Sequence, residues 1–256
     1  MARLATDSLT LRAGDKWLAR ELDLAIEAGQ NWAILGANGS GKTTLLHTLA
    51  GLRAPQAGIV RLDGQPIQTV ARRTRARTLA LLFQDSASAF PATVLETVLS
   101  GRHPHLGRLD TEGPADHAIA AAALEDVGLG ALATRTLGTL SGGERRRVEI
   151  AAVLAQQAPL CLWDEPINHL DPQHQVALLR RLSGRAQQSG HANLFVLHDI
   201  NLALRYCSHG LLLLPDGRHE HGLLDAIITA AALEAVYGCA MREVRAGERR
   251  LFIPAD

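Results

Sequence analysis

The spacing of hydrophobic residues changes twice along the chain and divides it into three segments. Up to about residue 83, apolar residues alternate with polar ones or form short runs, which predicts strands at LTL, LDLAI, NWAIL and TLALLF. Residues 84–139 are alanine-rich and follow a helical period, most clearly in ADHAIAAAALEDVGL. Residues 140–240 return to short continuous apolar runs, LCLW and NLFVL, which are typical of buried parallel strands.

This order predicts a single α/β domain over residues 1–256. Its core, from 1–83 and 140–240, has a mixed or parallel sheet, a helical subdomain is inserted at 84–139, and 241–256 form a C-terminal tail. Shorter patterns place the turns: AGIVRLDGQPI predicts two strands around an Asp-Gly turn, and LLLLPDGRHEHG predicts a second hairpin. Near the end, AIITAAALEAVYG predicts a helix and RRLFIPAD a last strand.

Composition narrows the class of protein. The chain has 26 basic and 26 acidic residues, so it lacks the basic excess of most nucleic-acid-binding domains, and we expect no nucleic-acid partner. Two local basic runs, RRTRAR (Arg72–Arg77) and RRR (Arg145–Arg147), are interpreted as solvated helix faces. The three widely spaced cysteines suggest neither a disulfide framework nor a zinc site, and Cys161 is expected in the core.

No apolar segment suggests a signal peptide or a membrane span. The N-terminal stretch MARLATDSLTLRAGDKW has no long apolar region, and the longest leucine run has four residues, Leu211–Leu214, against about 20 needed to cross a bilayer. We therefore expect a soluble chain in a reducing compartment, able to dock on a membrane protein.

The stretch GANGSGKT (Gly36–Thr43) matches the phosphate-loop pattern G-x-x-x-x-G-K-[ST], between a predicted strand and a predicted helix. Its glycines let backbone N–H groups approach phosphates, and the helix N-terminus adds partial positive charge. Lys42 is expected to reach the β- and γ-phosphates of ATP, and the Thr43 hydroxyl to bind Mg²⁺. The predicted phosphate loop comprises Gly36, Ala37, Asn38, Gly39, Ser40, Gly41, Lys42, Thr43 and Thr44.

A second motif, LCLWDEP, places two carboxylates at the end of a buried strand. Asp164 is expected to hold Mg²⁺ through water, and Glu165 to orient and deprotonate the attacking water. Gln84, which follows TLALLF, could contact Mg²⁺ or that water, and His198, which follows NLFVL, could contact the γ-phosphate. Alternatively, the carboxylates form a solvated acidic loop, and Gln84 and His198 are ordinary surface residues; the phosphate loop upstream favours the catalytic interpretation of the carboxylates.

A second glycine-rich helix start lies at LSGGE, the signature segment (Leu140–Glu144). Ser141 is predicted to be an N-cap, while Gly142 and Gly143 leave backbone N–H groups accessible, as in anion sites. Because this segment follows the helical insertion, far in sequence from the phosphate loop, we interpret it as a site for the ATP of a neighbouring subunit.

The chain carries, in this order, GANGSGKTT, Gln84, LSGGE, LCLWDEP, NHLD (Asn168–Asp171) and LHD. This set of motifs resembles the ATP-binding cassette (ABC) ATPases over nearly the whole chain. The resemblance implies a P-loop NTPase fold with a RecA-like core and a head-to-tail homodimer. Each ATP would then lie between the phosphate loop of one subunit and Ser141, Gly142 and Gly143 of the other, with Asp171 at the dimer seam. Every position needed for hydrolysis is present, so an active ATPase is expected.

A closer resemblance is carried by FPATVLETVLSGRHPHLG, HDINLALRYCSHGLLL and the tail LEAVYGCAMREV. These stretches are similar to ATPase subunits of importers for iron–siderophore complexes, haem and cobalamin. The resemblance implies a dimeric integral-membrane permease, gripped by the helical segment after Gln84, and a periplasmic substrate-binding protein as an indirect partner. It also implies a peripheral position on the cytoplasmic face of the inner membrane.

The chain departs from the family pattern in the signature helix, which continues into AAVL (Ala151–Leu154) where an A-R-A-L-like run is usual, and at the expected adenine contact. An aromatic residue usually stacks on adenine after the first strand, but Ala13 occupies that place here; Trp17, four residues later, either stacks on the base or packs within the protein. Other functional classes are a soluble ABC ATPase acting on ribosomes or DNA, an exporter ATPase, and a P-loop kinase or switch that works alone. The absence of a second cassette and of a coiled-coil insertion disfavours the first, and LSGGE disfavours the last.

Overall fold

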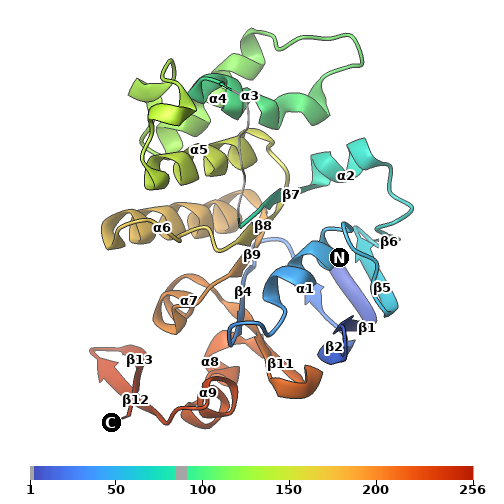
Figure 1. Cartoon of the computed structure of the whole chain (residues 1–256), viewed down its shortest axis with the longest axis vertical. Helices are drawn as coiled ribbons and strands as arrows, with labels where there is room; N and C mark the ends of the chain where they lie inside the picture. The colour runs from blue at the N-terminus through green and yellow to red at the C-terminus, as the bar shows by residue number, and fades with distance from the viewer. Residues whose placement is uncertain (1–2, 85–90, 256) are drawn as a thin grey trace. The chain divides into compact units, whose positions relative to one another are not determined.

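The computed structural model describes residues 3–84 and 91–255, which form two compact units (Figure 1). The first unit combines the chain up to residue 70 with the chain from residue 182 onward, and the second contains residues 71–181. Residues 85–90 of the predicted helical insertion lie outside the described residues. The predicted segment boundaries after residues 83 and 139 stay predictions.

The first unit has a buried, mostly parallel sheet. Strand β4 (Asn31–Gly36) is buried along its whole length and lies between β9 (Ala192–Val196) and β10 (His209–Leu213), both parallel to it. Strand β11 (His219–Leu223) pairs antiparallel with β10, which makes the sheet mixed. Because strands buried on both faces need apolar residues at consecutive positions, the continuous runs NWAIL and NLFVL were sufficient to predict β4 and β9.

The first unit also contains an antiparallel sheet, which is built from strands before residue 70. Its order is β2-β1-β5-β6, and β3 pairs with β1. The predicted Asp-Gly turn joins β5 and β6, with both turn residues at positive φ (45° at Asp63 and 82° at Gly64). These strands are β1 (Leu4–Ala13), β2 (Lys16–Leu22), β3 (Ala25–Ile26), β5 (Ala57–Leu62) and β6 (Gln65–Pro66).

The interpretation of LDLAI as one strand was wrong. Strand β2 ends at Leu22 and β3 begins at Ala25, so the chain leaves one pairing and starts another between them. The Thr6 hydroxyl donates to the Leu22 carbonyl (2.6 Å) and accepts from the Leu24 N–H (2.9 Å), while the Asp23 carboxylate accepts from the Ser8 N–H (2.6 Å). Side-chain hydrogen bonds thus join a single backbone bond, from the Thr6 N–H to the Leu24 carbonyl (2.9 Å), at this point, which alternation of hydrophobicity does not reveal.

Helices and a C-terminal hairpin complete the first unit. The predicted tail helix is present, and the predicted last strand pairs with a strand over MREVRA that the sequence pattern did not indicate. Asn201 attaches this hairpin to the helix after β9: its amide donates to the Phe252 carbonyl (3.1 Å) and accepts from the Phe252 N–H (2.8 Å). These elements are α1 (Lys42–Leu49), α7 (Ile200–Tyr206), η4 (Pro215–Gly217), α8 (Leu224–Ile227), α9 (Ala230–Tyr237), β12 (Met241–Ala246) and β13 (Arg249–Pro254).

The second unit is mainly helical. In its described residues, β7 (Leu79–Leu82) and β8 (Leu160–Asp164) form at the predicted strands TLALLF and LCLW and pair in parallel. Between them, the described residues form helices, of which α3 and α4 pack on α5 (Figure 1). The helices of this unit are α2 (Arg72–Thr78), α3 (Val94–Leu99), η1 (Ser100–His105), α4 (Pro114–Asp126), η2 (Gly130–Leu132), η3 (Leu137–Thr139), α5 (Gly142–Ala155) and the start of α6 (Pro172–Ser189).

Within the described residues 3–84 and 91–255, no helix is both long enough and apolar enough to span a bilayer.

Candidate active site

The phosphate loop connects β4 to α1 in the first unit. The N-cap of α1 is Gly41, in the left-handed region (φ 99°), and no side chain caps the helix. The Lys42 ammonium is buried and donates to two carbonyls of the same loop, those of Gly36 (2.8 Å) and Ala37 (3.1 Å). The sequence-predicted loop is therefore a backbone turn with a cation held against it, at a helix start with no side-chain cap.

Two of its glycines are required by close packing. A Cβ at Gly36 would lie 2.7 Å from Ser40 Oγ, and a Cβ at Gly41 would lie 2.9 Å from the side chain of Leu18. Both distances are shorter than van der Waals contact, so a larger residue would force the Ser40 side chain in the loop or the Leu18 side chain on β2 to move. Asn38 and Gly39 form the exposed tip, and Thr43 and Thr44 lie half-buried in the first turn of α1.

Sequence reasoning missed one cation beside this loop. The Lys16 ammonium, at the start of β2, donates to the Gly39 carbonyl (2.7 Å). Its neighbour Trp17 is half-buried, with the guanidinium groups of Arg12 and Arg20 lying 4.8 Å and 4.7 Å from its ring centroid. The indole thus has cation–π partners within the protein, and stacking of Trp17 on adenine stays a prediction.

The carboxylates of LCLWDEP lie at the end of β8 in the second unit. Asp164 is fully buried, and Glu165, 8% exposed, adopts a left-handed backbone (φ 49°), a conformation that costs a non-glycine residue roughly 1–3 kcal/mol. Glu165 Oε2 accepts from Gln84 Nε2 (3.2 Å) and from Asn168 Nδ2. The structure therefore brings together Gln84 and Glu165, which the sequence motifs identify separately, and adds Asn168, which they do not single out.

The signature segment begins α5, and Ser141 is its N-cap, as predicted. Ser141 and Glu144 form a complete capping box. Ser141 Oγ accepts from the Glu144 N–H (3.3 Å), while the Glu144 carboxylate accepts from the N–H and the hydroxyl of Ser141 (both 2.8 Å). The Ser141 N–H holds the pKa of the Glu144 carboxyl below its usual value. Glu144 is therefore an anion placed on the donors of Ser141.

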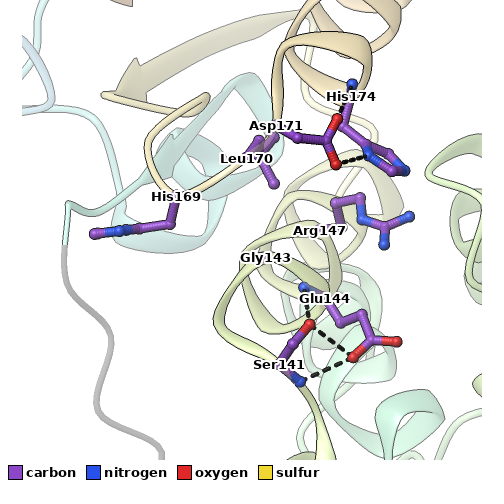
Figure 2. A pocket seen from close by; sticks show the side chains of 8 residues that line it. All are labelled: Ser141, Gly143, Glu144, Arg147, His169, Leu170, Asp171 and His174. Atoms are coloured by element: carbon purple, nitrogen blue, oxygen red, sulfur yellow. Dashed lines mark hydrogen bonds and ion pairs between the residues drawn. The ribbon is translucent and has the colours of Figure 1, made fainter.

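A pocket of about 310 Å³ opens beside this helix start (Figure 2). In Figure 2 the Arg147 side chain lies between the Ser141–Glu144 pair and the Asp171–His174 pair. Close approach at Gly143 shapes the pocket, because a Cβ there would lie 3.1 Å from the His169 carbonyl. The lining residues are Ser141, Gly143, Glu144, Arg147, His169, Leu170, Asp171 and His174.

Asp171 caps the start of α6. Its carboxylate accepts from the His174 N–H (3.0 Å), and its second oxygen lies 2.7 Å from His174 Nδ1. The His174 N–H lowers the pKa of the Asp171 carboxyl, which is exposed on the same surface as Ser141. A capped aspartate has few conformations, and this gives the predicted seam residue a defined direction.

The interpretation of RRR as a solvated helix face was wrong for its middle residue. Arg145 is exposed and Arg147 half-buried, but only 6% of Arg146 is exposed, and it contacts the segments that carry Gln84 and Glu165. A signal was available: Arg146 shares a helix face with Ile150 and Val153, which are buried. Its charge, taken alone, favours a position in solvent.

His198 follows β9 in the same unit as the phosphate loop and is exposed. The next residue, Asp199, caps α7 by accepting from the Leu202 N–H (2.9 Å). His198 thus stands where a buried strand ends and a capped helix begins, and its contact with a γ-phosphate stays a prediction.

The predicted Mg²⁺ donors are oxygen groups of the kind this ion prefers: a hydroxyl at Thr43, a carboxylate at Asp164 and an amide at Gln84. Among the described residues, no group of three or more His, Cys, Asp or Glu side chains could hold a metal ion.

Comparison with known proteins gives consistent matches. Residues 19–168 match the family model described as ABC transporter. The ferric enterobactin transport ATP-binding protein FepC of Escherichia coli (strain K12) is 41% identical over 239 residues, covering 93% of this chain and 88% of FepC. The hemin import ATP-binding protein HmuV of Pseudomonas entomophila (strain L48) is 43% identical over 241 residues, covering 92% of each chain.

Solved structures agree with these sequence matches. A chain from a putative metal-chelate type ABC transporter in an inward-facing conformation superposes with a TM-score of 0.86 at 27% identity, covering 100% of this chain and 98% of that chain. The dimeric ABC transporter cassette MJ0796 superposes with a TM-score of 0.74 at 26% identity, covering 85% of this chain and 97% of that chain.

Proposed function

The chain belongs to the ABC transporter family and is an ATPase of that family, and we propose that it powers the import of an iron–siderophore, haem or cobalamin-type substrate. The observation that carries this proposal is the 41–43% identity to FepC and HmuV across more than nine-tenths of the chain. The importer-like stretches of the sequence, from the helical segment to the tail, support the same class of importer. Cobalamin is one of the substrates that this class of importer carries.

We propose that the phosphates of ATP bind at residues 36–44. The backbone N–H groups of the loop and the start of α1 would donate to phosphate oxygens, and the Lys42 ammonium, now held by loop carbonyls, would pair with the β- and γ-phosphates. When bound, Mg²⁺ would neutralise part of the phosphate charge, held by the Thr43 hydroxyl, by Gln84 and, through water, by Asp164.

For hydrolysis, Glu165 is the proposed general base. Its carboxylate would accept a proton from water, the water oxygen would bond to the γ-phosphorus, and the bond to the β–γ bridging oxygen would break, leaving ADP and phosphate. Gln84, already in contact with the Glu165 carboxylate, would orient that water, and His198 would donate to the γ-phosphate as charge develops.

The working form we propose is a head-to-tail homodimer. Ser141, Gly142 and Gly143 of one subunit would contact the γ-phosphate bound by the other, and Asp171 would lie at the seam. The exposed positions of Ser141 and Gly142 and the dimeric cassette among the similar structures support this arrangement.

We further propose that this dimer acts on an integral-membrane permease dimer, as a peripheral subunit on the cytoplasmic face of the inner membrane. The helical segment after Gln84 would contact the permease, and a periplasmic substrate-binding protein would deliver the substrate to it. Closure on ATP would do mechanical work on the permease and hydrolysis would reset it.

The deciding experiment is light scattering of Glu165→Gln with and without ATP and Mg²⁺. We expect a dimer only when both are present, because binding survives while turnover collapses. Adding Ser141→Arg should return the protein to a monomer that still binds ATP. An ATP-loaded Glu165→Gln that stays monomeric even with its permease would contradict the composite site, and near-normal turnover would remove Glu165 from the role of base.

The substrate is found by uptake of labelled haem, ferric siderophore and cobalamin into cells that lack this protein. Loss of one uptake activity, restored by the wild-type chain but not by Glu165→Gln, would name the substrate. Unchanged uptake of all three would reject the proposed importer class.

A further inference from the structure

The guanidinium of Arg146 joins two segments of the second unit that carry the proposed chemistry. One of its terminal nitrogens donates to the carbonyls of Phe83 (2.7 Å) and Gln84 (3.3 Å), just after β7. The other donates to the carbonyls of Asp164 (2.5 Å) and Glu165 (3.0 Å), at the end of β8. A single side chain thus contacts the backbone of four residues, two of which are Gln84 and Glu165.

This contact requires a buried cation with a forked shape. Arg146 is 6% exposed, and the Glu149 carboxylate, 2.9 Å away on the same helix, supplies the opposite charge that such burial needs. Because the two carbonyl pairs are reached by different nitrogens, the planar guanidinium suits the arrangement and the single nitrogen of lysine does not.

The backbone that Arg146 contacts is strained where the carboxylate leaves it. Glu165 has φ 49°, a conformation that a residue with a side chain keeps only when its surroundings hold it. Arg146 binds the carbonyls on both sides of the Glu165 N–Cα bond, and it also binds the carbonyl of Gln84, whose amide donates to the Glu165 carboxylate. One guanidinium therefore contacts the backbone from which both side chains extend.

We propose that Arg146 is a positioning residue for ATP hydrolysis. It holds the backbone of Glu165 and Gln84 in one geometry. Because Arg146 belongs to α5, it also connects the helix that follows the signature segment to the backbone of Glu165. This inference rests on the roles given above to Glu165 and Gln84. It predicts an effect on the rate of the chemical step and little effect on the binding of ATP to the phosphate loop.

The test compares Arg146→Lys with Arg145→Lys, the same change at the exposed neighbouring position. Because a displacement of about 1 Å at a reacting group costs up to about 100-fold in rate, we expect kcat of Arg146→Lys to fall roughly 10- to 100-fold. The KM for ATP should stay within about twofold, and Arg145→Lys should match the wild type. Rates are expressed per nucleotide-binding site, from titration with a fluorescent ATP analogue, so that loss of folded protein does not lower kcat.

A double-mutant cycle with Glu165→Gln tests whether Arg146 acts through the carboxylate. If it does, Arg146→Lys lowers the residual rate of Glu165→Gln much less than it lowers the wild-type rate. Equal losses in both backgrounds, or a wild-type kcat for Arg146→Lys, would overturn the inference while leaving the function of Glu165 intact. If Glu165→Gln alone kept normal turnover, the proposed function of Glu165 would fail first and this inference with it.

Should Arg146→Lys fail to fold, Arg146→Gln keeps the test available, because its shorter neutral amide removes the need for a buried counter-charge. The expected result is again a fall in kcat per binding site with an unchanged KM. A loss of ATP affinity together with the loss of kcat would overturn the inference and assign Arg146 a general structural role instead.

Discussion

The two glycine-rich helix starts of this protein look alike in sequence and differ in structure. Helix α1 has Gly41 as its N-cap, without a side-chain cap or an acidic residue in its first turn, and the Lys42 ammonium is held against the preceding loop. Helix α5 has Ser141 as its N-cap with a complete capping box, and the carboxylate of Glu144 accepts from both the N–H and the hydroxyl of that serine. One start carries a cation, and the other carries its own anion.

The difference indicates how the two sites share the work of binding phosphate. At α1 the helix dipole, the N–H groups and Lys42 all favour an anion, so we expect this start to provide most of the affinity for a nucleotide. At α5 a phosphate must compete with Glu144 for Ser141. We therefore expect the second site to be weak alone and to respond to a nucleotide that is already bound elsewhere, as suits a site that closes a dimer.

The largest expected effect comes from removing the Lys42 ammonium at the start of α1. Lys42→Ala should lower the affinity for ATP about 10- to 100-fold, because hydrogen bonds to a charged group contribute roughly 1.5–3 kcal/mol. Titration with a fluorescent ATP analogue measures this loss. Lys16→Ala, which removes an exposed ammonium from the Gly39 carbonyl, is the matched control, with an expected loss below about threefold. Similar losses for both variants would mean that net charge, and not the position of Lys42, governs binding.

The next effect concerns the glycines at the starts of α1 and α5, whose replacement by alanine should lower the free energy of unfolding by different amounts. Gly41→Ala should destabilise most, because φ is 99° and the new Cβ would lie 2.9 Å from Leu18. Gly143→Ala, 3.1 Å from the His169 carbonyl, should cost about 1 kcal/mol, and Gly142→Ala, with nothing within 4 Å, should be neutral or slightly stabilising. Urea unfolding of the three variants gives the order, and a reversed order of Gly142 and Gly143 would refute the packing argument.

The smallest effect concerns the internal anion of the second start. Glu144→Gln keeps the capping box, since glutamine is also accepted at this position, but removes the charge that competes for Ser141. In the Glu165→Gln background, we expect dimerisation to need about two- to fivefold less ATP, measured by light scattering across an ATP titration. Glu125→Gln, a charge removal at an exposed position of α4, controls for net charge. An unchanged or higher ATP requirement would show that Glu144 does not oppose closure.

Local sequence patterns predict most of the residues of the site. The phosphate loop, the two carboxylates at the end of β8 and the N-cap at Ser141 all lie where the spacing of glycines, apolar runs and capping residues predicts them. The errors have a common origin: LDLAI, MREVRA and Arg146 depend on partners distant in sequence. Strand pairing at residues 22–26 is decided by Thr6 and Ser8, and the burial of Arg146 by carbonyls about 20 and 60 residues away.

By itself, the sequence determined the kind of chemistry, because a phosphate loop needs only consecutive residues, and its geometry is set by the backbone freedom of glycine and by the start of one helix. Only the tertiary structure decided which charged groups meet. It placed Gln84 and Asn168 on the Glu165 carboxylate, directed Arg146 into the protein and left Arg145 in solvent. The physical reason is that a buried charge is stable only beside its partners, and those partners come from strands that adjoin in space and not along the chain.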